Sequence, residues 1–259
     1  MITFSVITCT YNACGTLMRT LNSVMSQTWP HVEHLIIDGS SSDGTLEMAL
    51  RYKENSDVEE NGHSVSIVSE RDKGLYDAMN KGLARATGDY VVFLNAGDVY
   101  PSPDTLELIA GSVGEGEQLP AVLYGDTDIV NGEGHFLRHR RLQPPQEGLS
   151  WHSFRQGMLV CHQAFYARTD VAKRTAYDQR YRYSADVDWC IRIMKAAEHD
   201  ALPLKNVDMV VVNYLDGGMT TKNHRASLRE RFSVMRRHYG LLSTLGMHLW
   251  FVFRAVFKK

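Results

Sequence analysis

The residues of this 259-residue chain that are best placed to do chemistry are aspartates that follow short apolar runs. Asp98 ends the stretch Asn95-Ala96-Gly97-Asp98, directly after the apolar segment 90–94. A carboxylate on a tight turn can reach a divalent cation, and hard oxygen ligands suit Mg²⁺ or Mn²⁺. Asp98 is therefore a candidate metal ligand. The alternative interpretation is a turn residue that only caps, because aspartate is common in such turns.

A second aspartate, Asp38, follows the apolar segment 34–37 and precedes the polar loop 39–44. Its carboxylate is a candidate acceptor for a nucleobase. The alternative is a plain helix-capping loop, and both interpretations can hold if Asp38 binds the base while Ser42 or Asp43 caps the following helix.

A third acidic site is Asp186-Val187-Asp188-Trp189, at the expected start of a helix. A carboxylate there could act as the general base that activates a hydroxyl. The alternative is a helix-start acid, which the helix dipole stabilises by about 0.3–1 kcal/mol. Asp186 and Asp188 are two residues apart and do not share a helix face, so at most one of them is expected to be the base.

Two weaker signals come later in the chain. His162 and Gln163 follow the apolar segment 158–161 and could line a sugar pocket, although a structural histidine is the commoner case. Gly217 and Gly218, before Met219-Thr220-Thr221, would let the backbone approach a ligand, or form only a turn.

The first hundred residues alternate strand and helix patterns, which predicts βαβ units and a parallel sheet. Ligands bind at the carboxyl ends of such strands, where Asp38 and Asp98 would lie close together. The expected strands are 4–8, 34–37, 64–69 and 90–94, and apolar residues at helical spacing lie between them at Leu17, Leu21 and Val24 and at Leu75, Met79 and Leu83.

The second half of the chain has a different predicted order of strands and helices. Residues 121–130 and 135–142 predict an antiparallel pair around the Asn131-Gly132 turn. A helix is expected over 186–197, a strand over 209–212, a basic helix over 225–239 and an apolar helix over 241–257. We therefore expect one domain over 1–221, made of a mostly parallel half (1–100) and a second half (101–221), followed by a helical tail over 222–259.

The charge of this tail differs from that of the rest of the chain. Residues 222–259 hold nine Lys/Arg and one acid, which gives a net charge of +8. Since the whole chain has a net charge of −2, residues 1–221 have a net charge of −10. The apolar segment 241–257 contains His248 and Arg254 and is short for a spanning helix. Its Trp, Phe and flanking basic residues favour an interfacial helix on an anionic membrane surface. The alternative is a helix packed on the body.

Other function classes find no support in the sequence. The four cysteines have no CxxC spacing, and there is no Gly-x-Gly-x-x-Gly, Gly-Lys-Ser/Thr or Gly-x-Ser-x-Gly motif. No nucleic-acid partner is expected. We see no signal peptide, and unpaired cysteines are typical of a reducing cytosol. The expected location is cytoplasmic and peripheral on the inner membrane.

The order of these motifs resembles glycosyltransferase family 2. The resemblance rests on Ser5–Asn12, Ile37–Thr45, Ser69–Gly82 and Gly88–Asp98, and it extends to Tyr124-Gly125-Asp126, Cys161–Ala164, Tyr181–Arg192 and Gly217–Thr221, which resemble a bacterial branch that includes colanic-acid-type transferases.

This resemblance implies the α/β GT-A fold: a Rossmann-like, mostly parallel sheet flanked by helices, with a small antiparallel part and, here, C-terminal helices. It also implies inverting transfer of a hexosyl group from a nucleotide-sugar donor to a saccharide or lipid-linked acceptor in polysaccharide synthesis, with Mg²⁺ or Mn²⁺. On this resemblance, residues 1–221 form the catalytic domain, with a nucleotide-binding half (1–100) and an acceptor-side half (101–221). Asp186 takes the position of the base and Asp98 that of the last metal-motif acid. The nucleotide-sugar positions are Thr10, Tyr11, Asn12, Asp38, Asp72, Lys81, Asn95, Ala96 and Gly97, and His162, Gln163, Asp188 and Trp189 are assigned to the acceptor or sugar pocket.

The sequence departs from the family pattern at the metal motif, which is commonly Asp-x-Asp. Asn95 stands where an acid is common, so Asp98 is the only acid of the stretch. This leaves open a non-catalytic nucleotide-sugar-binding or scaffold protein on the same fold. A nucleotidyltransferase would need a basic, glycine-rich loop after the first strand, and residues 9–17 contain no Lys or Arg.

Overall fold

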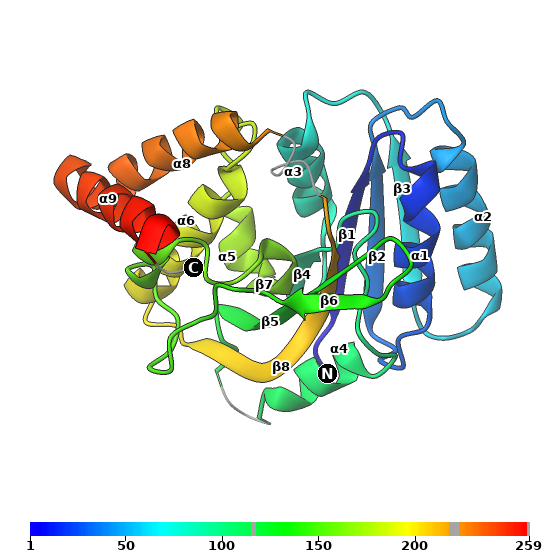
Figure 1. Ribbon diagram of the computed structural model, residues 1–259. Helices are drawn as coiled ribbons and strands as arrows, with labels where there is room; N and C mark the ends of the chain where they lie inside the picture. Colours follow the sequence, from blue (N-terminus) through cyan, green and yellow to red (C-terminus); the bar gives the residue numbers. More distant parts are fainter. Residues whose placement is uncertain (115–117, 218–222, 258–259) are drawn as a thin grey trace.

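The computed structural model describes residues 1–114, 118–217 and 223–257 and is built around one mixed sheet (Figure 1). The strand order is β3-β2-β1-β4-β7-β5-β6, and β8 pairs with β5. The fold class expected from the sequence, a mostly parallel sheet flanked by helices, is confirmed.

The first half consists of βαβ units, as predicted. Strands β1, β2, β3 and β4 are parallel neighbours, with bounds Phe4–Thr10, Val32–Asp38, Ser64–Ser69 and Tyr90–Phe93. Helices α1 (Cys14–Met25), α2 (Thr45–Val58) and α3 (Leu75–Arg85) connect them. The side chains of Leu17, Leu21 and Val24 are fully buried on α1, as their helical spacing predicts.

The parallel register determines what lies at the carboxyl edge of the sheet. Thr10, the last residue of β1, is the Cα partner of Asp38, the last residue of β2. Gly82 lets α3 pack close against β1, because a Cβ there would lie 2.6 Å from Cγ2 of Ile7. The strand ends therefore meet at one edge, as the pattern predicts.

The second half is antiparallel where the Asn131-Gly132 turn predicts it. Strands β5 (Val122–Val130) and β6 (Phe136–His139) form that pair. The short elements α4 (Thr105–Ser112), η1 (Ser153–Gln156), η2 (His162–Ala164), β7 (Phe165–Arg168) and α5 (Thr169–Lys173) were not predicted. Strand β8 (Leu204–Leu215) is longer than the expected 209–212, because it pairs with the whole of β5.

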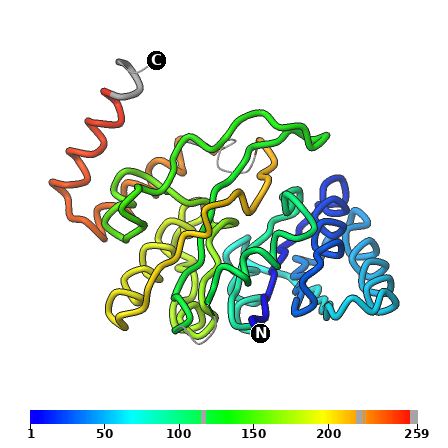
Figure 2. The backbone as a smooth tube through the Cα atoms, turned by 90° about the horizontal axis from the view of Figure 1, so that it is seen from below, coloured from blue at the N-terminus to red at the C-terminus, as the bar shows by residue number. Residues whose placement is uncertain are grey.

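Three long helices complete the chain: α6 (Ala185–His199), α8 (His224–Tyr239) and α9 (Leu241–Phe257). Helix α8 contacts α6, and α9 contacts α8 and η1, while the far end of α9 points away from the body (Figure 2). In the parts of the chain that the structure describes, no helix is both long and apolar enough to cross a membrane.

Candidate active site

The end of β2 holds a buried carboxylate surrounded by hydrogen-bond donors. Oδ1 of Asp38 accepts hydrogen bonds from the hydroxyls of Thr10 (3.0 Å) and Ser41, and Oδ2 accepts them from the Ser69 hydroxyl (2.7 Å) and the Ser41 backbone N–H (3.0 Å). Burial raises the pKa of Asp38, but these hydrogen bonds outweigh it and hold the pKa below its ordinary value. Asp38 is therefore an ionised anchor of the loop.

The other predicted nucleotide residues of the first half gather around this anchor. The Tyr11 side chain is 69% exposed, and Oδ1 of Asn12 accepts the backbone N–H of Ser42 (2.9 Å). The Asp72 carboxylate lies so close to Gly39 that a Cβ there would be 2.5 Å from Oδ2. The structure thus brings Thr10, Tyr11, Asn12, Asp38 and Asp72 together.

Lys81 lies apart from this group. Its ammonium donates to the carbonyl of Arg71 (2.7 Å) and is 3.1 Å from Oε1 of Glu70. As it lies, Lys81 supports the loop before α3, and its assignment to the nucleotide stays a prediction.

The end of β4 contains a second buried aspartate with different surroundings. Asp98 is 4% exposed. Oδ1 accepts the backbone N–H of Leu215 and Oδ2 accepts Nε2 of Gln163, both at 2.9 Å. Burial raises the pKa of Asp98 to about 7, against these hydrogen bonds, which lower it. Asp98 ties β4 to η2 and to the end of β8.

The turn before Asp98 is shaped by close packing. Gly97 has φ +107°, and a Cβ there would lie 2.6 Å from Cδ2 of Leu215. Thr20 accepts the Gly97 N–H at 2.8 Å, and its own hydroxyl donates to the Asp98 carbonyl. Ala96 packs beside the smaller core cluster under α1 and α2.

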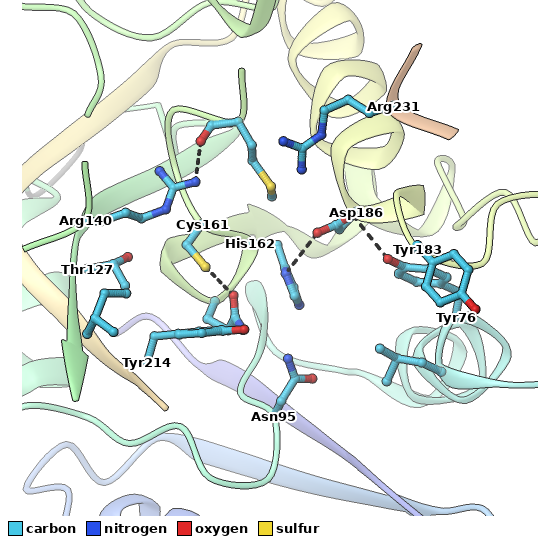
Figure 3. A pocket seen from close by; sticks show the side chains of 14 residues that line it. Tyr76, Asn95, Thr127, Arg140, Cys161, His162, Tyr183, Asp186, Tyr214 and Arg231 are labelled. Atoms are coloured by element: carbon cyan, nitrogen blue, oxygen red, sulfur yellow. Dashed lines mark hydrogen bonds and ion pairs between the residues drawn. The ribbon is translucent and has the colours of Figure 1, made fainter. Parts of the chain in front are cut away.

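A cavity of about 220 Å³ lies beyond this turn, between the strand ends and α6. Its polar lining comes from many elements (Figure 3): Tyr76, Asn95, Thr127, Arg140, Cys161, His162, Gln163, Tyr183, Asp186, Tyr214 and Arg231. Asn95, His162, Gln163 and Asp186 were predicted from the sequence, so the structure brings these four together.

Among the residues that the structure describes, Asp186 is the only acid that lines this cavity. It stands in the first turn of α6, where the Tyr76 hydroxyl donates to Oδ1 at 3.2 Å and Nδ1 of His162 lies 3.7 Å from Oδ2. Burial lowers the pKa of His162, although Asp186 opposes the shift, so the imidazole is neutral at pH 7. A carboxylate held this way beside a cavity can accept a proton from a hydroxyl.

Asp188 and Trp189 lie away from the cavity. Asp188 is fully buried and binds Arg192 (2.6 Å) and His238 (2.8 Å). Trp189 is also fully buried and stacks on Tyr177, with ring centroids 4.8 Å apart. Their assignment to a sugar pocket gains no support from this geometry. Of the Gly217–Thr221 motif, residues 218–221 lie outside the described residues.

The two arginines of the cavity were not among the site residues predicted from the sequence. Arg140 lies just beyond β6, and Arg231 belongs to α8, whose positive charge was read as a membrane signal. The charge run itself was visible, but no local pattern shows which arginine faces inward.

Fold and site together define a GT-A-type enzyme scaffold. Residues 5–175 match the model of the family described as glycosyl transferase family 2. The chain is 34% identical over 220 residues to the PGL/p-HBAD biosynthesis glycosyltransferase of Mycobacterium bovis. These residues cover 83% of this chain and 77% of that protein. The chain therefore belongs to glycosyl transferase family 2 and is a glycosyltransferase. The predicted resemblance is confirmed.

Further relatives and solved structures agree with this assignment. The amylovoran biosynthesis glycosyltransferase AmsB of Erwinia amylovora is 29% identical over 221 residues, with 81% of this chain and 70% of AmsB covered. S. aureus TarS in complex with UDP-GlcNAc has a TM-score of 0.70 at 20% identity and covers 91% of this chain and 65% of its own. The structure of the mannosyltransferase PcManGT of Pyrobaculum calidifontis in complex with GDP-Man and Mn²⁺ has a TM-score of 0.62 at 16% identity. The match covers 99% of this chain and 76% of PcManGT.

Proposed function

We propose that this glycosyltransferase moves a sugar from a nucleotide-diphosphate sugar to a hydroxyl of a polysaccharide precursor, with inversion at the sugar. The observation that carries the proposal is Asp186, the single acid among the described residues that line a cavity at the carboxyl edge of the sheet. In this reaction the acceptor oxygen forms a bond to the anomeric carbon while the bond from that carbon to the diphosphate oxygen breaks. Asp186 takes the proton of the acceptor hydroxyl.

The nucleotide is assigned to the loop ends of β1 and β2. Asp38 and its hydroxyl neighbours form a rigid polar floor, and the exposed ring of Tyr11 offers a stacking face for a base. TarS and PcManGT, which share the fold, were solved with UDP-GlcNAc and GDP-Man. These complexes support a nucleotide-sugar donor for this chain and do not distinguish between the nucleotides.

A divalent metal fits these residues poorly. Both oxygens of Asp98 are engaged, and its side chain does not line the cavity. Among the described residues, no group of three or more His, Cys, Asp or Glu side chains could hold a metal ion. The buried Oδ1 of Asn95, which has no partner, is the oxygen that this turn would offer. A bound Mg²⁺ or Mn²⁺ would neutralise diphosphate charge, but Asp98 as it lies would not hold it.

The acceptor is proposed to be lipid-linked because α9 presents an apolar surface. Leu242 is 86% exposed, Leu249 73% and Val252 62%. Such a helix beside basic residues suits the interface of an anionic membrane. In a liposome flotation assay, full-length protein should float with anionic vesicles and a 1–240 truncation should not. Equal flotation of the two proteins would rule out membrane binding through α9.

The test of the enzymatic proposal is turnover across a panel of nucleotide-sugars, with lipid-linked and free saccharide acceptors. Asp186→Asn should lower acceptor-dependent turnover about 10²–10⁴-fold, the range that a general base contributes. Donor affinity should stay unchanged. The matched control is Asp178→Asn, the same substitution at an aspartate that does not line the cavity. Tight donor binding without turnover on any acceptor would favour the scaffold alternative.

A further inference from the structure

The departing diphosphate needs positive charge, and the cavity supplies it from two arginines. If the proposed function is correct, negative charge builds up on the diphosphate as the sugar leaves, and cationic groups at that point accelerate the step. Asp98 is not placed to hold a metal there. Arg140 and Arg231 both line the cavity, against one acid, Asp186. The lining therefore has a net positive charge that suits an anionic ligand.

Of the two arginines that line the cavity, Arg231 is the one with a buried N–H that lacks a partner. Its side chain reaches from α8 toward the cavity above Asp186 (Figure 3). Its Nε is buried and has no hydrogen-bond partner. A buried guanidinium N–H without a partner is costly unless a ligand accepts it. We propose that Arg231 binds the diphosphate of the nucleotide-sugar and stabilises it as it leaves.

Arg140 supplies a second charge to the cavity, and backbone carbonyls hold it in place. Its guanidinium donates to the carbonyls of Leu142 and Leu159, both at 2.8 Å, and to that of Met158. Burial lowers the pKa of Arg140, and the charge of Arg231 lowers it further. The two guanidinium groups thus repel each other in the free protein, and a bound anion between them would relieve that repulsion.

The position of Arg231 is set by the residue before it in the sequence. The Glu230 carboxylate accepts the backbone N–H groups of Arg182 (2.9 Å), Tyr183 (2.7 Å) and Ser184 (3.0 Å). These groups lead directly into α6, which carries Asp186. Glu230 therefore locks α8 against the start of α6 and holds Arg231 beside the proposed base.

Two other basic side chains in the described part of the chain, His162 and Lys81, do not fill this role. His162 is neutral, because burial lowers its pKa. Lys81 donates to the Arg71 carbonyl outside the cavity lining. A guanidinium also presents paired N–H groups that match two phosphate oxygens, which an ammonium cannot do.

The test measures binding directly, by isothermal titration calorimetry on the full chain in the presence of EDTA. The ligands are inorganic pyrophosphate, whichever of UDP, GDP and dTDP binds wild type most tightly, and the corresponding nucleoside. The variants are Arg231→Gln, Arg231→Lys and, as a matched control, Arg229→Gln. Arg229 lies on the same helix, is exposed and does not line the cavity.

We expect Arg231→Gln to weaken pyrophosphate and nucleoside diphosphate binding by about tenfold or more, the loss of one charge-assisted hydrogen bond. Nucleoside binding should stay unchanged. Arg231→Lys should bind with intermediate affinity, and Arg229→Gln should behave as wild type.

Unchanged diphosphate affinity in Arg231→Gln, with wild-type thermal unfolding, would overturn the proposal. So would an unchanged donor affinity combined with a raised KM for a diphosphate-linked acceptor, which would assign Arg231 to the acceptor. If wild type binds no nucleotide and transfers no sugar, the proposed function fails. Pyrophosphate binding that depends on Arg231 would still support the anion site in that case.

Discussion

The ends of β2 and β4 both flank β1, and each has a buried aspartate, but the two carboxylates have opposite environments. Asp38 accepts four hydrogen bonds, which hold its pKa below the ordinary value. Asp98 accepts two, and burial raises its pKa to about 7. The difference shows that a carboxylate at a strand end can either prepare a ligand site or join distant segments.

The partners of the two residues explain this difference. Ser41 is three residues from Asp38, and Thr10 and Ser69 lie on the neighbouring strands β1 and β3. The partners of Asp98, Gln163 and Leu215, are 65 and 117 residues away. The β2 end is therefore built by the parallel half alone, whereas the β4 end depends on the second half of the chain.

The largest effect is expected at the β2 end. Asp38→Ala leaves three hydroxyls and one backbone N–H without their acceptor, and unpaired buried donors cost about 1–3 kcal/mol each. We expect the free energy of unfolding to fall by about 3 kcal/mol and nucleoside diphosphate affinity to fall about a hundredfold. Urea unfolding and calorimetry measure the two quantities. Asp57→Ala, in an exposed acid of α2, is the control, and equal behaviour of the two variants would contradict the ligand role of Asp38.

The two ends should also respond to pH with opposite signs. Folding raises the pKa of Asp98 from 3.8 to about 7, so the folded state binds more protons in this range and stability falls as pH rises from about 4 to 7. The slope from this one group is at most about 1.4 kcal/mol per pH unit. Folding lowers the pKa of Asp38, so its contribution is present above pH 3.8 and is lost as pH falls below that value.

Urea unfolding at several pH values separates these contributions. Asp98→Asn should flatten the profile between pH 4 and 7, and Asp38→Asn should leave that range unchanged and alter the acid limb. A profile between pH 4 and 7 that is the same in wild type and Asp98→Asn would contradict the burial argument.

A smaller effect is expected on metal dependence. If Asp98 joins segments and binds no ion, Asp98→Asn should change turnover with and without Mn²⁺ by the same factor. Its unfolding free energy at pH 8 should change by about 1 kcal/mol, the contribution of one altered hydrogen bond. Turnover assayed over a Mn²⁺ series checks this. A selective loss of the Mn²⁺-dependent part would restore Asp98 as the metal ligand.

The smallest effect is expected where α8 holds α6. Glu230→Gln keeps the shape of the side chain but removes the charge that accepts three backbone N–H groups. We expect a loss of about 1 kcal/mol in stability, a lower kcat and a weaker donor affinity, because Asp186 and Arg231 lose their fixed positions. Glu54→Gln, on the exposed side of α2, is the control for thermal unfolding and kinetics. A normal kcat in Glu230→Gln would show that this contact does not position the site.

The sequence predicts most of the first half because its signals are local. Hydrophobic spacing places β1 to β4 and α1 to α3, and parallel pairing then brings Thr10 and Asp38 together. Strand β7 and helix α4 could not be predicted in this way, because they have only four and eight residues and show no periodic pattern.

The site is less predictable than the fold because its members come from distant segments. Asp186 is visible as a helix-start acid, but nothing local shows that Arg231 faces it. Likewise, the N–H of Leu215 that binds Asp98 is a backbone group, which no side-chain pattern can reveal.

The contact between Glu230 and the start of α6 bears on how this enzyme can be recombined with its relatives. The family match ends at residue 175, before Asp186, Glu230 and Arg231. A chimera joined at residue 221 would combine one protein's base with another's α8 and lose the matched pair, whereas a junction at residue 175 would take both from the same protein. Exchange of parts between such enzymes should therefore move α6 and α8 as one unit, with the junction at Gly240, where the backbone leaves α8 at φ +80°.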